Sequence, residues 1–129
     1  MPPRAKRILC VEDDDDTSSM LCSLLGLINC EVSTAGTVAE ALDKIGAGHF
    51  DLYLLDCWLP GGGGVGLCRR IRELDPSTPI VFYSGANLES ERLEALAAGA
   101  QAYLVKPGEI AMLVETVERL LGVPPPKGP

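Results

Sequence analysis

Short apolar runs alternate with longer stretches of helical spacing along this chain. The apolar runs lie at 7–11, 31–35, 51–55, 79–83 and 102–105. They are continuous rather than alternating, which is typical of strands buried on both faces. After each run, apolar positions recur every three or four residues, which indicates an amphipathic helix. The predicted helices lie at 18–28, 37–45, 65–74, 88–99 and 109–122.

Local signals mark the ends of these helices. The segment "TVAE" has the capping-box pattern, with Thr37 as cap and Glu40 three residues later. Gly99 and Gly122 follow the last periodic residues of their helices, where a left-handed glycine ends a helix well. Five strand–helix units with short connections predict an α/β fold. We expect a doubly wound, flavodoxin-like parallel sheet of five strands in the order 2-1-3-4-5, with five helices.

The repeating pattern fills 7–122, which we expect to form one domain because 129 residues suit a single core. Hydrophobic residues make up 47% of the chain, enough to build that core. We assign 1–6 as an N-terminal tail. The proline-rich end, 123–129, reads as an extended tail or the start of a linker.

Charge, apolar segments and cysteine content argue against a nucleic-acid-binding, secreted, membrane-spanning or disulfide-bonded protein. The net charge of −7 disfavours direct nucleic-acid binding, although Arg69, Arg70 and Arg72 leave room for a small basic patch. The N-terminal apolar run is too short for a signal peptide, and no stretch is long enough to span a membrane. The five cysteines are odd in number and lack CxxC spacing, so we expect free, buried or half-buried thiols. We therefore expect a cytoplasmic protein.

Reactive side chains follow four of the five predicted strands. An acidic run, 12–16, follows the first strand; Asp56 follows the third, Ser84 the fourth and Lys106 the fifth. In an open parallel sheet these positions meet at one edge, where ligands bind. Clustered carboxylates repel unless a cation joins them, and oxygen ligands of this kind suit Mg²⁺. With an ammonium and a hydroxyl added, the set predicts a site for a phosphoryl group.

Each of these residues alone has an ordinary explanation: a solvated helix start, a turn serine, a surface lysine. Their coincidence at one sheet edge is the informative feature. The segments "ILCVEDD", "DLYLLDCWLPGGGG", "PIVFYSG" and "AYLVKP" occur in this order and on the expected elements. Together they resemble the response-regulator receiver domain of bacterial two-component signalling, over about 7–121.

This resemblance implies a phosphorylation site and a metal site. Asp56 would accept the phosphoryl group. Mg²⁺ would be bound by Asp13, by Asp56 and by the backbone carbonyl of Trp58, with Glu12 acting through a water molecule. The sequence departs from the family pattern at Glu12, one methylene longer than the usual aspartate, and at Gly63, where an acidic or small polar residue is frequent.

The resemblance also implies a conformational switch. Ser84 and Lys106 would bind the phosphoryl oxygens, and Ser84 with Tyr103 would form the switch that changes a surface on the fourth helix, fifth strand and fifth helix. The implied partners are a sensor histidine kinase or phosphotransfer protein, an effector domain or partner, and a second copy through that surface.

Two alternatives remain open at this point. One is a receiver fold that serves only as a constitutive protein-interaction module. The other is a Mg²⁺-dependent phosphatase with an aspartyl nucleophile. Such enzymes need a general acid two residues after the nucleophile, and here that position holds Trp58. The sequence therefore favours a regulatory domain over an enzyme.

Overall fold

A computed structural model describes residues 4–122 and contains five strands that alternate with five helices. The strands are β1 (Lys6–Val11), β2 (Cys30–Ala35), β3 (Leu52–Leu55), β4 (Ile80–Ser84) and β5 (Ala102–Val105). The helices are α1 (Asp15–Gly26), α2 (Val38–Ala47), α3 (Gly64–Leu74), α4 (Glu89–Ala97) and α5 (Ile110–Leu121).

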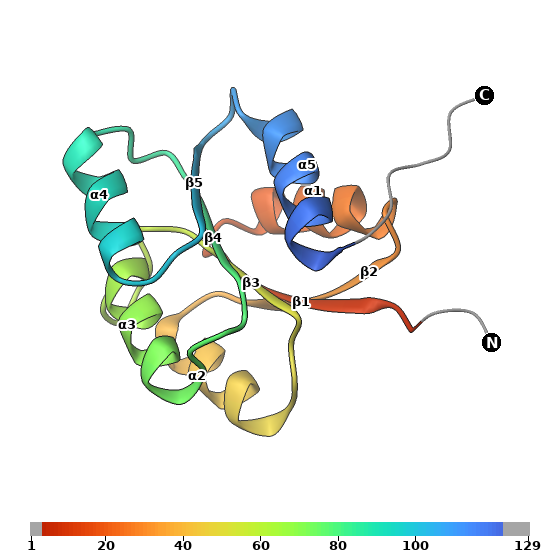
Figure 1. Ribbon diagram of the computed structural model, residues 1–129, viewed down its shortest axis with the longest axis horizontal. Coiled ribbons are helices and arrows are strands. Elements are labelled where there is room, and N and C mark those ends of the chain that lie inside the picture. The colour runs from red at the N-terminus through yellow and green to blue at the C-terminus, as the bar shows by residue number, and fades with distance from the viewer. Residues whose placement is uncertain (1–3, 123–129) are drawn as a thin grey trace.

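All strand pairs are parallel, and the order in the sheet is β2-β1-β3-β4-β5, as predicted. Helices α1 and α5 cover one face, and α2, α3 and α4 cover the other (Figure 1). The strand order reverses between β1 and β3, so the connections leaving these two strands part at the carboxyl edge. That divergence opens a place for a ligand at this edge.

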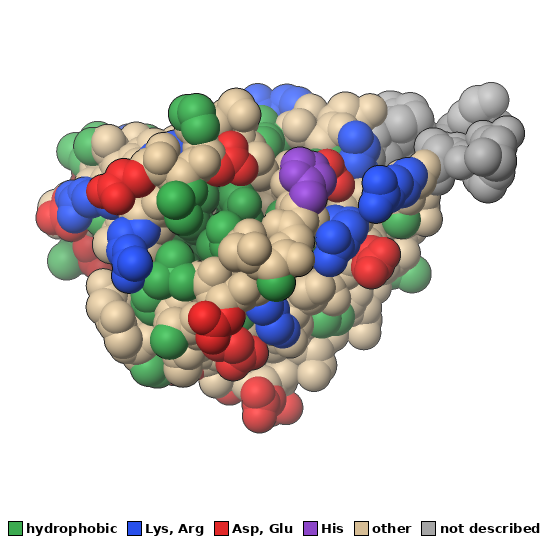
Figure 2. Space-filling view, turned by 90° about the horizontal axis from the view of Figure 1, so that it is seen from below, with side chains coloured by type: hydrophobic (Ala, Val, Ile, Leu, Met, Phe, Trp, Pro, Cys, Tyr) green, Lys and Arg blue, Asp and Glu red, His purple; other side chains and the backbone are tan. Residues whose placement is uncertain are grey.

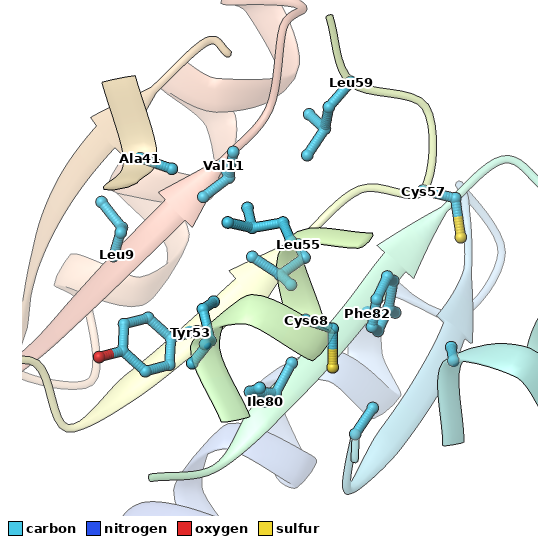
Figure 3. Close-up of a cluster of buried hydrophobic side chains, with 14 of the residues drawn as sticks. Leu9, Val11, Ala41, Tyr53, Leu55, Cys57, Leu59, Cys68, Ile80 and Phe82 are labelled. Carbon is cyan, nitrogen blue, oxygen red and sulfur yellow. The ribbon is translucent and has the colours of Figure 1, made fainter. Parts of the chain in front are cut away.

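The sheet separates two apolar cores. Leu9, Tyr53 and Phe82 point towards α2, α3 and α4 (Figure 3), whereas Ile8, Leu54 and other neighbours in the strands pack against α1 and α5. Successive residues of one strand thus enter opposite cores, which explains the continuous apolar runs. Burial of a side chain of this size contributes about 1.5–3 kcal/mol, so the two cores dominate the stability of the fold.

The helix ends largely follow the predicted signals. Thr37 accepts a hydrogen bond from the Glu40 N–H at 3.1 Å, and Gly99 and Gly122 have positive φ angles of 117° and 69°. One boundary was predicted too late: α1 begins at Asp15, three residues before 18. The reason is Asp14, whose carboxylate caps the helix by accepting bonds from the Thr17 N–H at 2.9 Å and the Thr17 hydroxyl at 2.6 Å.

The cysteine and membrane expectations can be compared with the described residues. All five cysteines are free; four are buried and Cys22 is partly exposed, as predicted. Between residues 4 and 122, no helix has the length and apolar character needed to cross a bilayer.

Candidate functional site

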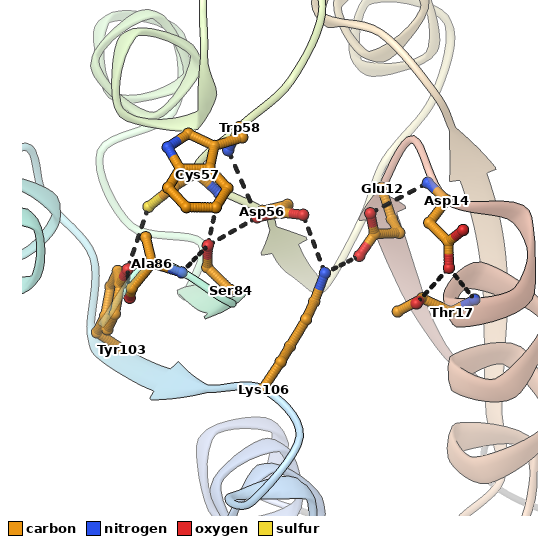
Figure 4. A network of polar contacts seen from close by, with 10 residues as sticks. All are labelled: Glu12, Asp14, Thr17, Asp56, Cys57, Trp58, Ser84, Ala86, Tyr103 and Lys106. Carbon is orange, nitrogen blue, oxygen red and sulfur yellow. Dashed lines mark hydrogen bonds and ion pairs between the residues drawn. The ribbon is translucent and has the colours of Figure 1, made fainter. Parts of the chain in front are cut away.

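The fold brings the predicted residues together at the carboxyl edge of the sheet. Glu12 follows β1, Asp56 follows β3 and Lys106 follows β5, while Ser84 is the last residue of β4 rather than the first after it. Because the strands are parallel, these four positions lie side by side across β1, β3, β4 and β5 (Figure 4).

Lys106 joins two buried carboxylates. Its Nζ atom donates a hydrogen bond to Asp56 Oδ2 at 2.9 Å and another to Glu12 Oε1 (Figure 4). Only 5% of Glu12 and 7% of Asp56 are exposed, so both need this cation. Burial raises the pKa of Glu12 even though Lys106 opposes the shift. Burial disfavours the charge of Lys106, but its bonds to Glu12 and Asp56 outweigh that effect and raise its pKa.

Asp13 completes an acidic cluster with these two residues. Carboxylate oxygens of Glu12, Asp13 and Asp56 all lie within 4.8 Å of one another, and Asp13 faces solvent. When all three are ionised, one ammonium leaves two negative charges uncompensated. Oxygen donors at this spacing with one open side are the set that Mg²⁺ prefers. These residues therefore fit a divalent cation.

The rest of the acidic run has an ordinary role. Asp14 caps α1, and Asp15 and Asp16 occupy its first turn, where the helix dipole favours negative charge. Glu12 and Asp13 belong to the site, and the next three acids stabilise the helix that follows it.

Ser84 connects Asp56 to the β4–α4 loop. Its hydroxyl donates a hydrogen bond to Asp56 Oδ1 at 2.7 Å and accepts one from the Ala86 N–H at 3.2 Å. The Cys57 N–H points at the same Ser84 oxygen from 3.4 Å. Ser84 is completely buried, so its hydroxyl can act only on groups inside the site.

Tyr103 lies inward beside this network. Its ring stacks on Phe82 with a centroid distance of 5.8 Å, and its hydroxyl donates a hydrogen bond to the Ala86 carbonyl at 2.5 Å. The same hydroxyl lies 3.4 Å from Cys57 Sγ. Burial is the main cause that raises the pKa of Tyr103, and the contact with Cys57 raises it further. The sequence placed Tyr103 in the strand beside Ser84 correctly but gave no sign of the contact with the Cys57 thiol.

The β3–α3 connection carries the residues next to Asp56. Trp58 is 65% exposed, and its N–H points at Asp56 Oδ1 from 3.4 Å. At Gly64 a Cβ atom would lie 1.9 Å from the Asp56 carbonyl oxygen, so this position excludes any side chain. The sequence contains a run of four glycines here, but it did not show that Gly64 is required by the backbone of Asp56.

Comparison with known proteins agrees with this geometry. Residues 8–118 match the family described as the response regulator receiver domain. The nisin biosynthesis regulatory protein NisR of Lactococcus lactis is 35% identical over 112 residues, covering 87% of this chain and 48% of NisR. The transcriptional regulatory protein PrrA of Mycobacterium tuberculosis is 37% identical over 115 residues, 89% of this chain and 49% of PrrA. The chain thus spans about half the length of these curated relatives.

Solved structures give the same result. A CheY-like receiver domain protein from Methanospirillum hungatei superimposes with a TM-score of 0.86 at 32% identity, covering 92% of this chain and 94% of its own. TrrA from Thermotoga maritima, solved in complex with Mg²⁺ and beryllium fluoride, has a TM-score of 0.81 at 31% identity, covering 89% and 98%. With a parallel sheet that gathers acids, a hydroxyl and a lysine at one edge, this chain belongs to the receiver-domain family of two-component response regulators.

Proposed function

We propose that this domain is a phosphorylation-dependent switch in which Asp56 accepts the phosphoryl group. The observation that carries the proposal is the setting of its carboxylate. Ser84 donates to one oxygen and Lys106 to the other, and two further acids stand beside it. A carboxylate is a competent nucleophile towards phosphorus when nearby positive charge offsets the charge of the incoming group.

The reaction is an in-line displacement at phosphorus. One Asp56 oxygen forms the new O–P bond while the P–N bond of a phosphohistidine breaks, and the histidine nitrogen leaves with the electron pair and takes up a proton. With a small donor such as acetyl phosphate, the acetate oxygen leaves instead. Lys106 and Ser84, which now bind the Asp56 carboxylate, are then close to the new phosphoryl group. Lys106 pairs with one phosphoryl oxygen, and the Ser84 hydroxyl turns from the carboxylate to a second phosphoryl oxygen.

Asp13, Asp56 and the Trp58 carbonyl would hold Mg²⁺, with Glu12 acting through water. The ion would offset the charge of the acids and of the incoming group. TrrA, a similar protein, was solved with Mg²⁺ and beryllium fluoride, which supports the same ion here.

We propose that the signal leaves through α4, β5 and α5. Ser84 and Tyr103 lie on the neighbouring strands β4 and β5, so a change at Asp56 reaches this surface directly. The surface carries exposed apolar side chains at Leu88 (62%), Leu93 (53%) and Met112 (50%). They suit a protein partner: an effector or a second copy. The phosphoryl donor would be a histidine kinase or a phosphotransfer protein.

Intact-protein mass spectrometry tests the proposal. After incubation with acetyl phosphate and Mg²⁺, the mass should increase by one phosphoryl group. The increase should disappear in Asp56→Asn and on addition of EDTA. Asp15→Asn is the matched control, because it removes an exposed acid of the same run that lies outside the cluster. A gain that survives in Asp56→Asn would refute the assignment. No gain from acetyl phosphate or from any phosphohistidine donor would favour a constitutive interaction module.

A further inference from the structure

Cys57 contacts both residues of the proposed switch, Ser84 and Tyr103, although it is not itself part of that pair. It directly follows Asp56 and is 8% exposed. Its backbone N–H points at Ser84 Oγ from 3.4 Å, and its Sγ atom lies 3.4 Å from the Tyr103 hydroxyl (Figure 4). One residue therefore touches both Ser84 and Tyr103, while being bonded covalently to Asp56.

The direction of the thiol contact follows from counting protons. The Tyr103 hydroxyl has one proton, and it donates this proton in a hydrogen bond of 2.5 Å to the Ala86 carbonyl, which can only accept. The hydroxyl oxygen is then left as an acceptor facing Cys57 Sγ. The thiol is therefore the donor, and a chain of hydrogen bonds runs from Cys57 through Tyr103 to the β4–α4 loop.

Two parallel connections thus link the Asp56–Cys57 segment to Ala86. One runs from Asp56 through the Ser84 hydroxyl to the Ala86 N–H. The other runs from the Cys57 thiol through the Tyr103 hydroxyl to the Ala86 carbonyl. The first is broken when the Ser84 hydroxyl turns to a phosphoryl oxygen. The second depends only on the orientation of the Tyr103 ring.

We infer that Cys57 is a positioning residue for the switch: its thiol donates a hydrogen bond to the Tyr103 hydroxyl and biases the ring inward before any phosphoryl group arrives. This inference deepens the proposed function and rests on it for its biological meaning. The bias is modest, because a thiol is a weak donor. A single weak hydrogen bond changes a two-state ratio about threefold.

The orientation of Tyr103 in the unphosphorylated protein tests the inference directly. The ratio of inward to outward rings can be followed by NMR of the Tyr103 side chain. Cys57→Ala should lower that ratio about threefold, whereas Cys57→Ser, which keeps a donor, should restore it at least to the wild-type value. Cys68→Ala is the matched control, because Cys68 is a buried thiol on α3 whose Sγ donates a hydrogen bond to the Ala98 carbonyl, at 3.5 Å, rather than to a residue of the switch.

Tyr103→Phe separates the hydrogen bond from packing. In the Tyr103→Phe background the acceptor is absent, so Cys57→Ala and Cys57→Ser should give the same ring orientation. Thermal unfolding of each variant verifies that it is folded. An unchanged ratio in Cys57→Ala, or a loss that Cys57→Ser does not recover, would overturn the inference.

Acetyl phosphate and Mg²⁺ provide the second arm of the experiment. If Asp56 is the acceptor, the wild type and Cys57→Ala should show the same gain in mass, that of one phosphoryl group, with more inward rings in both. Because the thiol bond depends only on the ring orientation, phosphorylation should multiply the ratio by the same factor in both proteins and leave Cys57→Ala about threefold below the wild type. If no phosphoryl group is taken up, the proposed function fails, yet the comparison of resting rings still decides the role of Cys57.

Discussion

The two edges of the sheet each hold a cation in a polar network, and the networks are built from different partners. At the carboxyl edge, Lys106 binds the carboxylates of Glu12 and Asp56 beside a third acid, Asp13. At the amino edge, Arg72 at the end of α3 donates five hydrogen bonds of 2.7–3.0 Å. Four of them go to the backbone carbonyls of Asp75, Thr78 and Gly99, and the fifth goes to the Gln101 side chain.

The difference separates a network that is satisfied within the chain from one that retains excess charge. The acceptors of Arg72 are neutral and are satisfied within the chain, so this edge needs no ligand. The carboxyl edge retains excess negative charge among atoms that the fold holds within 4.8 Å. Such a cluster costs stability and is useful only when a cation or an incoming group uses it. Arg72, which the sequence grouped with Arg69 and Arg70 as a basic patch, belongs instead to the structural network.

The largest effect is expected from removing the structural cation. Arg72→Ala leaves several partly buried carbonyls without a donor and should lower the free energy of unfolding by about 3 kcal/mol. Urea denaturation measures the change. Arg69→Ala is the matched control: it removes an exposed arginine from the same helix and should cost under about 0.5 kcal/mol. Equal effects of the two variants would show that the amino-edge network carries no special stability.

At the carboxyl edge we expect a substitution to stabilise the protein rather than to destabilise it. Asp13→Asn removes one of three clustered negative charges and should raise the free energy of unfolding of the Mg²⁺-free protein by about 1 kcal/mol. The gain should shrink as Mg²⁺ is added, because the ion binds the wild type more tightly. Destabilisation of the Mg²⁺-free protein by Asp13→Asn would mean that the cluster is already compensated within the chain.

The smallest effect concerns Asp75, next to the amino-edge network. Its carboxylate accepts bonds from the N–H groups of Ser77 and Thr78 at 3.2 and 3.0 Å. Burial opposes the charge of Asp75, but these bonds outweigh it and lower its pKa. The folded pKa lies below the unfolded value, so the contribution is complete above about pH 4 and is lost as the pH falls further. Between about pH 5 and about pH 3, Asp75→Asn should therefore lose less stability than the wild type; identical pH profiles would contradict the assigned shift.

Most of the fold could be predicted because its signals are local. The continuous apolar runs, the Thr37 cap and the terminal glycines Gly99 and Gly122 each depend on a few neighbouring residues. The strand order and the gathering of Asp56, Ser84 and Lys106 at one edge followed from general rules for parallel sheets.

The unpredicted features depend on contacts between distant segments. Gly64 is required because the Asp56 carbonyl lies against it, and Cys57 meets Tyr103 across 46 residues of sequence. Arg72 reaches Gly99 and Gln101 only once α3 and β5 are in place. No periodicity or motif contains such distances, so only the folded arrangement reveals these roles. Figure 2 shows the molecule from below, with the single histidine next to an acidic side chain and with several basic side chains to its right.

A Mg²⁺ titration tests most directly whether the carboxyl edge is built for a cation that the amino edge does not need. Trp58 is the only tryptophan and lies two residues from Asp56, so its emission reports on this site. The emission of the wild type should change and saturate at millimolar Mg²⁺; Asp13→Asn should weaken the response, and Asp75→Asn should leave it unchanged. A flat titration in the wild type, or an equal response in Asp13→Asn, would contradict the account.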